Sequence, residues 1–118
     1  PTILNNLIAS NRTDGIWVKE DFYGMIINNT IADNQGAGIY HQLDTGRPPI
    51  AENNLIISNS RGLVAANTLT NTPTVWFNNV SGNTNGNWAN YPAEAGSMTT
   101  TNRNGTPADV YQNISVEP

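Results

Sequence analysis

The fold of this chain is indicated most directly by Ile26-Ile27-Asn28-Asn29-Thr30-Ile31-Ala32-Asp33-Asn34, followed by Gly38-Ile39-Tyr40. Its Asn-Asn pair recurs with spacings of 23, 25 and 25 residues, at Asn5-Asn6, Asn28-Asn29, Asn53-Asn54 and Asn78-Asn79. In the first three copies an Ile stands two residues after the pair, a further Asn comes three residues after that Ile, and a Gly with an apolar residue comes next. A period near 24 residues indicates a solenoid, in which each repeat packs against its neighbours.

Each repeat has room for about three short strands. The apolar runs, such as Met25-Ile26-Ile27 and Leu55-Ile56-Ile57, are short, β-branched and interrupted by Asn or Gly, which is typical of strands separated by tight turns. No window keeps the i, i+3, i+4, i+7 pattern of an amphipathic helix. We therefore predict an all-β fold, a parallel β-solenoid of about three to four coils with 23–25 residues each, over residues 1–82.

Stacked coils place equivalent residues one above another, about 4.8 Å apart. Two columns are expected to face inward: Ile8, Ile31 and Ile56 in one, and Ile3, Ile26, Ala51 and Trp76 in the other. The second Asn of each pair is placed at a bend, where Asn tolerates a left-handed backbone. Its amide is expected to hydrogen-bond to equivalent amides in adjacent coils. The predicted ladder is Asn6, Asn29, Asn54 and Asn79; plain turn residues are the alternative.

The repeat resembles the right-handed parallel β-helix proteins of the pectate-lyase-like superfamily, whose short repeats are often found in secreted or surface proteins. The resemblance rests on the stretch quoted above and its counterparts, and covers roughly residues 2–82. It implies a right-handed parallel β-helix and an extracellular, cell-surface or periplasmic location. It says little about activity, because the family includes polysaccharide lyases, hydrolases, epimerases, phage tailspikes, adhesins and scaffolds without enzymatic activity.

The register decays after Asn79, and residues 83–118 are rich in Gly and Asn. We expect them to form an irregular, loop-rich extension or cap. A free-standing solenoid needs capping repeats with polar outer faces, and neither end of the chain has an obvious one. The expectation is therefore a segment of a longer parent chain, or a subunit that stacks on further coils.

Composition and charge narrow the classes of partner. The chain has 118 residues, enough for one domain, and its formal net charge is −4. This balance argues against nucleic acid, which favours a basic surface. No run approaches the ~18 apolar residues of a membrane-spanning helix, so we expect no membrane insertion. There is no Cys, and therefore no thiolate nucleophile.

In each repeat a strand is expected to begin at the Gly and its following apolar residue. The outer face of these strands is the candidate binding surface. With Ile16, Ile39 and Leu63 inward, the period of two puts Trp17, Tyr40 and Val64 outward, and Lys19 in the next outward column. Aromatic rings offer apolar contact to sugar rings, and nearby charged groups orient the ligand. The predicted carbohydrate-binding residues are Trp17, Lys19, Tyr40, Asp44 and Arg47. An ordinary cross-strand aromatic pair is the alternative for Trp17 and Tyr40.

No catalytic cluster can be identified. His41 is the only His, and strict alternation either stacks it inward with Val18 and Ala65 or makes it the start of a turn. There is no Gly-x-Ser-x-Gly motif, and no carboxylate pair for glycoside hydrolysis can be assigned. An enzyme of this kind would be a polysaccharide lyase or a glycoside hydrolase. No metal is predicted; Ca²⁺ at the oxygen-rich turns around Asp14 and Asp33 is the alternative, without an EF-hand pattern.

Two functional hypotheses follow from these observations. The first is a secreted or cell-surface module that binds or processes polysaccharide on the outer face of one sheet. The second is a non-catalytic structural or adhesive module, such as part of a surface protein, a tailspike or a stacked assembly. A periplasmic accessory protein is a third variant.

Overall fold

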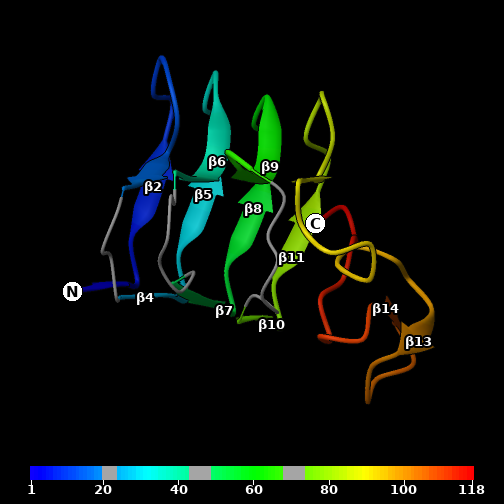
Figure 1. Cartoon of the computed structure of the whole chain (residues 1–118). Helices are drawn as coiled ribbons and strands as arrows, with labels where there is room; N and C mark the ends of the chain where they lie inside the picture. The colour runs from blue at the N-terminus through cyan, green and yellow to red at the C-terminus, as the bar shows by residue number, and fades with distance from the viewer. Residues whose placement is uncertain (20–23, 43–48, 68–73) are drawn as a thin grey trace.

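The computed structural model describes residues 1–19, 24–42, 49–67 and 74–118, in which the successive coils of the chain are stacked side by side (Figure 1). The first sheet consists of β1 (Thr2–Leu4), β4 (Met25–Ile27), β7 (Ile50–Glu52) and β10 (Val75–Trp76). The second sheet consists of β2 (Leu7–Ala9), β5 (Thr30–Ala32), β8 (Leu55–Ile57) and β11 (Asn79–Ser81). The third sheet consists of β3 (Ile16–Val18), β6 (Ala37–His41), β9 (Arg61–Ala65) and β12 (Trp88–Ala89).

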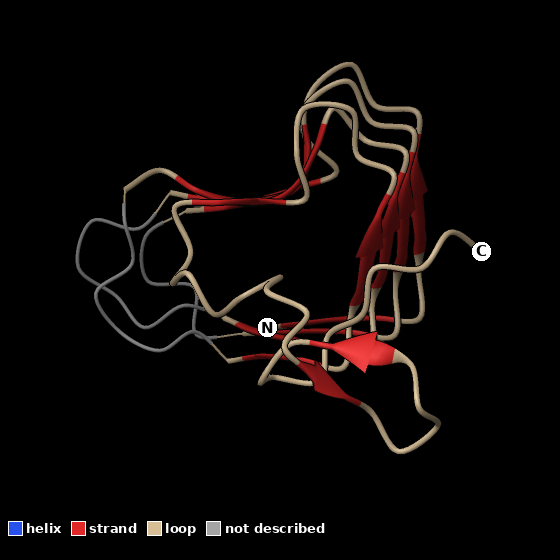
Figure 2. Ribbon diagram, turned by 90° about the vertical axis from the view of Figure 1, so that its right-hand side faces the viewer, coloured by secondary structure: helices blue, strands red, loops and turns tan. Residues whose placement is uncertain are grey.

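All pairings within these three sheets are parallel, and each strand pairs with the equivalent strand of the next coil. Seen along the stack, the strands of each sheet overlie one another on three sides of the molecule (Figure 2). The described residues form no helix. The prediction of an all-β parallel β-solenoid is therefore confirmed.

The core lies between the three sheets and is built from columns of apolar side chains. Ile8 pairs with Ile31, and Ile31 with Ile56, and the latter two are completely buried. Ile26, Ile39 and Leu63 are also 0 % exposed. At about 25 cal/mol per Å² of apolar surface, this burial is the main favourable contribution to folding.

A ladder of Asn side chains runs along one corner of the solenoid. Asn6 Nδ2 donates to Asn29 Oδ1 at 3.2 Å, and Asn29 Nδ2 donates to Asn54 Oδ1 at 3.1 Å. The backbone N–H of each of these residues donates to the same oxygen. Each Oδ1 thus receives two hydrogen bonds from the preceding coil, and all the steps point in one direction along the stack. We call this the first ladder.

The bend at this ladder differs from the expectation. The left-handed backbone belongs to the first Asn of each pair, with φ of 58° at Asn5, 55° at Asn28 and 53° at Asn53. The left-handed residue turns the chain, which leaves the following Asn to direct its amide along the stack. The prediction that the second Asn of each pair has the left-handed backbone was therefore wrong by one residue.

The fourth coil corrects the predicted ladder. Asn54 Nδ2 donates to Asn78 Oδ1 at 3.0 Å, 24 residues away, so the ladder residue is Asn78 and not Asn79. The left-handed position before it is held by Phe77, with φ of 58°. Strand pairing gives the physical reason, because a slip of one residue would turn every side chain of a strand over.

The shift of one residue in the fourth coil also corrects the predicted inward column that contained Trp76. Val75 pairs with Ala51 and Val80 pairs with Ile56, and both valines are completely buried. A spacing of 25 residues would instead have put the larger Trp76 and the polar Ser81 in these columns. Trp76 lies half-buried beside the core.

A second ladder, not predicted from the sequence, runs along another corner. Nδ2 of Asn11, Asn34 and Asn59 donates to Oδ1 of Asn34, Asn59 and Asn83, respectively. A left-handed residue again precedes each ladder Asn: Ser10, Asp33, Ser58 and Gly82. Gly38 lies against this ladder, and a Cβ there would collide with Ile56 Cγ2 and crowd Asn59 Nδ2. This contact explains why Gly recurs in the repeat.

Residues after the fourth coil fold against its exposed edge (Figure 1). Phe77 N–H donates to the Tyr111 carbonyl, Val80 N–H donates to the Ile114 carbonyl, and Tyr111 packs edge-on against Trp76. A short antiparallel hairpin, β13 (Thr100–Thr101) and β14 (Pro107–Ala108), lies in this segment. The predicted boundary after residue 82 stays a prediction.

Candidate functional site

An aromatic pair lies on the outer face of the third sheet, as the alternation predicts. Trp17 pairs with Tyr40, and Tyr40 pairs with Val64. The two ring centroids are 6.3 Å apart with an interplanar angle of 60°, within the range of favourable edge contacts. Trp17 is 55 % exposed and Tyr40 is half-buried. We call Trp17 and Tyr40 the aromatic platform.

Lys19 belongs to this platform through a cation–π contact. Its Nζ lies 4.4 Å from the centroid of the Trp17 ring, within the usual range for such contacts. The ammonium group therefore covers part of one face of the indole. A ligand that stacks on Trp17 would meet Lys19 as a hydrogen-bond donor at the same place.

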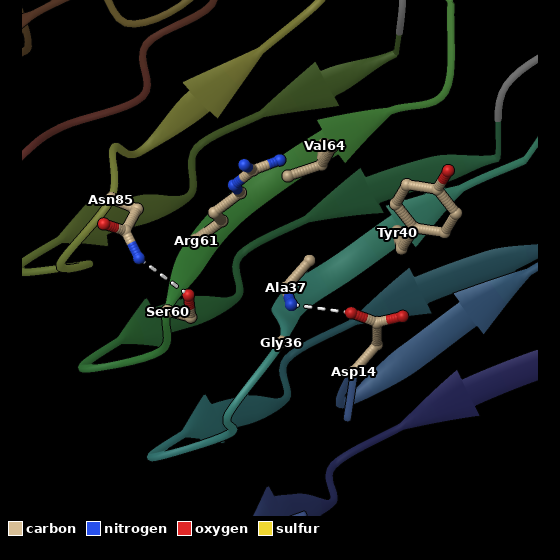
Figure 3. A pocket seen from close by; sticks show the side chains of 8 residues that line it. All are labelled: Asp14, Gly36, Ala37, Tyr40, Ser60, Arg61, Val64 and Asn85. Carbon is tan, nitrogen blue, oxygen red and sulfur yellow. Dashed lines mark hydrogen bonds between the residues drawn. The ribbon is translucent and has the colours of Figure 1, made fainter. Parts of the chain in front are cut away.

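Beside the platform, the outer face is hollowed into an open groove of about 290 Å³ (Figure 3). We call it the polar groove, and its lining residues are Asp14, Gly36, Ala37, Tyr40, Ser60, Arg61, Val64 and Asn85. Ala37, Val64 and the Tyr40 ring supply its apolar surface. Tyr40 lines the groove and also belongs to the platform, so the two features are continuous.

The polar side chains of the groove come from different coils and are partly fixed. Asp14 Oδ1 accepts the Ala37 backbone N–H at 2.6 Å. Asn85 Nδ2 donates to Ser60 Oγ at 3.0 Å. Arg61 is exposed, and its guanidinium extends toward Val64 in Figure 3. The groove therefore presents a carboxylate, a hydroxyl, an amide and a guanidinium around an apolar floor.

The structure brings three of the five predicted carbohydrate-binding residues onto one face. Trp17, Lys19 and Tyr40 lie together, whereas Asp44 and Arg47 lie outside the described residues. The groove residues Asp14 and Arg61 were not predicted as binding residues. The available signal was their alignment, because Arg61 pairs with Ala37 and the pairing of Ile16 with Ile39 puts Asp14 in the same column. The alignment does not show which way the two side chains point.

His41 and Tyr91 form a buried polar pair behind this sheet. His41 pairs with Val18 and Ala65 and is 0 % exposed, so the inward orientation is confirmed. Its Nδ1 lies 2.6 Å from the Tyr91 hydroxyl. Among the described residues, Nε2 has no hydrogen-bond partner. Burial lowers the pKa of His41 from 6.5 to about 4 and raises the pKa of Tyr91.

We expect this pair to make the stability of the fold depend on pH. Because the folded pKa of His41 is about 4, the unfolded chain binds the proton more tightly. The contribution is complete above about pH 6.5 and is lost as the pH falls toward 4, by about 3 kcal/mol at ~1.36 kcal/mol per pKa unit. Urea unfolding at a series of pH values measures it.

The control for this prediction removes both polar groups together. The double variant His41→Leu/Tyr91→Phe leaves no unpaired hydroxyl behind, and its unfolding free energy should lack this pH-dependent component. A wild-type curve that is parallel to that of the double variant between pH 6.5 and 4 would contradict a neutral, buried His41.

The described part of the chain contains no group of three or more His, Asp or Glu side chains that could hold a metal ion. At the turns where calcium was the alternative, Asn34 Oδ1 accepts from Asn11 and Asp14 Oδ1 accepts from Ala37. These oxygen atoms therefore already serve the fold.

Comparison with known proteins gives one match. The family model described as "Right handed beta helix region" matches residues 1–106. Neither a search of curated proteins nor a search of solved structures found a match. Across residues 1–19, 24–42, 49–67 and 74–118, no helix has the length and apolar character needed to cross a membrane.

Proposed function

Because the chain belongs to the right-handed β-helix family, we propose that it is a β-helix module that binds polysaccharide on the outer face of its third sheet. The observation that carries this proposal is the exposed aromatic platform, which continues into the polar groove. Its setting would be extracellular, on a cell surface or in the periplasm. Fold alone does not specify a ligand, so the argument rests on this face.

The chemistry of the face suits a sugar chain. Trp17 offers a large exposed ring, and such rings contribute contact area at low entropic cost. Lys19 supplies a donor beside that ring. The strands beneath are held by parallel pairing on both sides of β6, so the platform is rigid before a ligand arrives. Rigid sites lose less entropy on binding.

We propose binding as the primary role, with catalysis as the less supported variant. Asp14 is the one carboxylate among the described lining residues. A lyase or glycoside hydrolase would need a second acid–base group at the same groove. The segments outside the described residues, which carry Asp44 and Arg47, adjoin this sheet in sequence.

Replacing Trp17 by Ala tests the proposed function. We expect binding to a responsive polysaccharide to weaken at least about tenfold, or ~1.4 kcal/mol, because the main stacking surface is removed. Isothermal titration calorimetry against a panel of soluble neutral and acidic polysaccharides measures the effect. Trp17 is 55 % exposed, so the variant should remain folded.

Phe77→Asn is the matched control. Phe77 is 56 % exposed but lies at the corner between the first and second sheets, and Asn occupies the equivalent left-handed position in the other coils. Its affinity should equal that of the wild type. Equal losses in both variants, or an unaffected Trp17→Ala, would contradict a binding site on the third sheet.

A second candidate, a structural module that extends a stack of coils, is favoured by the polarity of the two ladders. In the first coil, Oδ1 of Asn6 and Oδ1 of Asn11 accept no hydrogen bond from the described residues. Leu7 beside them is 74 % exposed. A further coil with Asn at the ladder positions would supply the donors and cover Leu7. Absence of binding across the polysaccharide panel would favour this candidate.

A further inference from the structure

The size and the side chains of the polar groove indicate which kind of sugar would fit it. The volume of the groove, about 290 Å³, lies just below the range of about 300–1,000 Å³ that is usual for ligand sites. Its surface is an apolar floor, Ala37 and Val64, with a polar rim. A site of this size and make-up suits one unit of a longer chain rather than the whole ligand.

Asp14 is positioned as an acceptor for a ligand hydroxyl. Its Oδ1 is held by the Ala37 N–H, which fixes the orientation of the carboxylate. Its Oδ2 points away from Ala37 (Figure 3) and accepts no hydrogen bond from the described residues. Gly36 leaves space for this arrangement, because a Cβ there would collide with Asp14 Oδ1.

The opposite end of the groove supplies donors. Asp14 comes from the first coil and Arg61 from the third, so they are separated by about two strand spacings, ~9–10 Å. In the described part of the chain Arg61 forms no ion pair. Ser60 Oγ accepts from Asn85, and its own hydroxyl proton therefore remains free to donate.

The formal charges of the groove cancel, but the two charged groups are not equally exposed to water. The half-buried Asp14 would repel the carboxylate of a uronic acid, whereas the exposed Arg61 would attract it only weakly, because solvent screens its charge. The hydroxyl groups of a neutral sugar both donate and accept, so they satisfy the two ends without leaving a charge unpaired.

We propose that the polar groove is a subsite for a neutral pyranose unit of the bound polysaccharide, with Asp14 accepting from and Arg61 donating to its hydroxyl groups. This inference rests on the proposed function of the third sheet. It adds a preference against acidic sugars, set by Asp14.

The test compares oligosaccharides that differ only at C6 of each sugar unit. Oligomers of galacturonate, glucuronate and mannuronate are each paired with the same oligomer after reduction of its carboxylates to primary alcohols. Calorimetry on the full chain should show the neutral member of at least one pair binding about tenfold more tightly. Tighter or equal binding of every acidic member, or no binding in any pair, would overturn the subsite assignment.

Asp14→Asn locates the preference. The amide keeps an oxygen for the Ala37 N–H, so the fold should be retained, while the charge at the groove is removed. We expect the acidic member of the responsive pair to gain about tenfold in affinity and the neutral member to lose a few-fold. Asp33→Asn, an exposed carboxylate outside the groove, should leave the preference unchanged.

The two proposals fail in different ways. If Asp14→Asn leaves the neutral-over-acidic ratio unchanged while Trp17→Ala still abolishes binding, the subsite is wrong and the polysaccharide-binding function stands. If Trp17→Ala binds every oligomer as the wild type does, the proposed function itself is wrong.

Discussion

Asn78→Leu should lower the free energy of unfolding by about 3 kcal/mol or more, whereas Asn79→Leu should cost no more than about 1 kcal/mol. Asn78 is 0 % exposed, and its Oδ1 accepts both the backbone N–H and Nδ2 of Asn54. Its Nδ2 donates to the Ala51 carbonyl and to Asn113 Oδ1. Leu would leave the buried N–H of Asn54 without an acceptor, and an unpaired buried group costs about 1–3 kcal/mol in addition to the other lost bonds.

The neighbouring Asn79 is the matched control, because it has the same side chain one residue away. It is half-buried, and its amide exchanges hydrogen bonds with the Val116 backbone in an exposed setting. Urea unfolding of the two variants decides the register of the fourth coil. Equal costs, or a larger cost at Asn79, would mean that this coil is shifted by one residue from the pairing described above.

Much of the solenoid can be predicted from the sequence, because stacking turns sequence period into spatial columns. The phase of Ile8, Ile31 and Ile56 is sufficient to identify an inward column. The error at the fourth coil arose from treating the Asn-Asn pair as the repeating unit. Physically the unit is a left-handed residue followed by a ladder Asn, and the first position also accepts Phe77.

The second ladder is also built from a left-handed residue followed by a ladder Asn. Asn11, Asn34 and Asn59 are visible in phase in the sequence, but Ser or Asp precedes them rather than a second Asn. The recurring left-handed turn is a backbone property, and several residue types adopt it where the ladder bonds hold the chain. A search for isolated Asn in phase would have found this ladder.

The candidate site was predictable only in part. Alternation along a strand places Trp17 beside Tyr40 with certainty once the coils are aligned. The groove depends on Asp14 and Arg61, which come from coils two apart and reach Tyr40 from the strand ends. Side-chain direction at strand ends does not follow the period of two, so the sequence pattern does not reveal that the two charges face one groove.

The first ladder ends at Asp109, where a substitution should also cause a large loss of stability. The ladder continues from Asn78 to Asn113, 35 residues further on. At every step the Nδ2 group of one Asn needs an acceptor oxygen on the next residue of the ladder. Asp109 supplies the last one. Its Oδ1 accepts the N–H groups of Tyr111 and Asn113 at 2.9 Å each, and its Oδ2 accepts Gly96 N–H and Asn113 Nδ2 at 2.8 and 3.0 Å.

A carboxylate suits this place because it accepts only. Another Asn would again present an NH₂ group that needs a partner, whereas two carboxylate oxygens can take several donors. Asp109 is 0 % exposed, and these donors offset the cost of burying its charge. An acceptor-only side chain therefore suits the buried end of this ladder. The second ladder ends instead on the half-buried Asn87, whose Nδ2 donates to Ser115 Oγ.

Asp109→Asn should accordingly destabilise the chain by roughly 2–4 kcal/mol, although the two side chains have nearly the same shape. Bonds to a charged acceptor are each worth ~1.5–3 kcal/mol. In either orientation of the amide, its NH₂ group would face donors: Gly96 N–H and Asn113 Nδ2 in one, and the N–H groups of Tyr111 and Asn113 in the other. Urea unfolding measures the loss, and Asp33→Asn at an exposed position should stay within about 0.5 kcal/mol of the wild type. An Asp109→Asn variant as stable as the wild type would show that the ladder does not need an acceptor-only residue at its end.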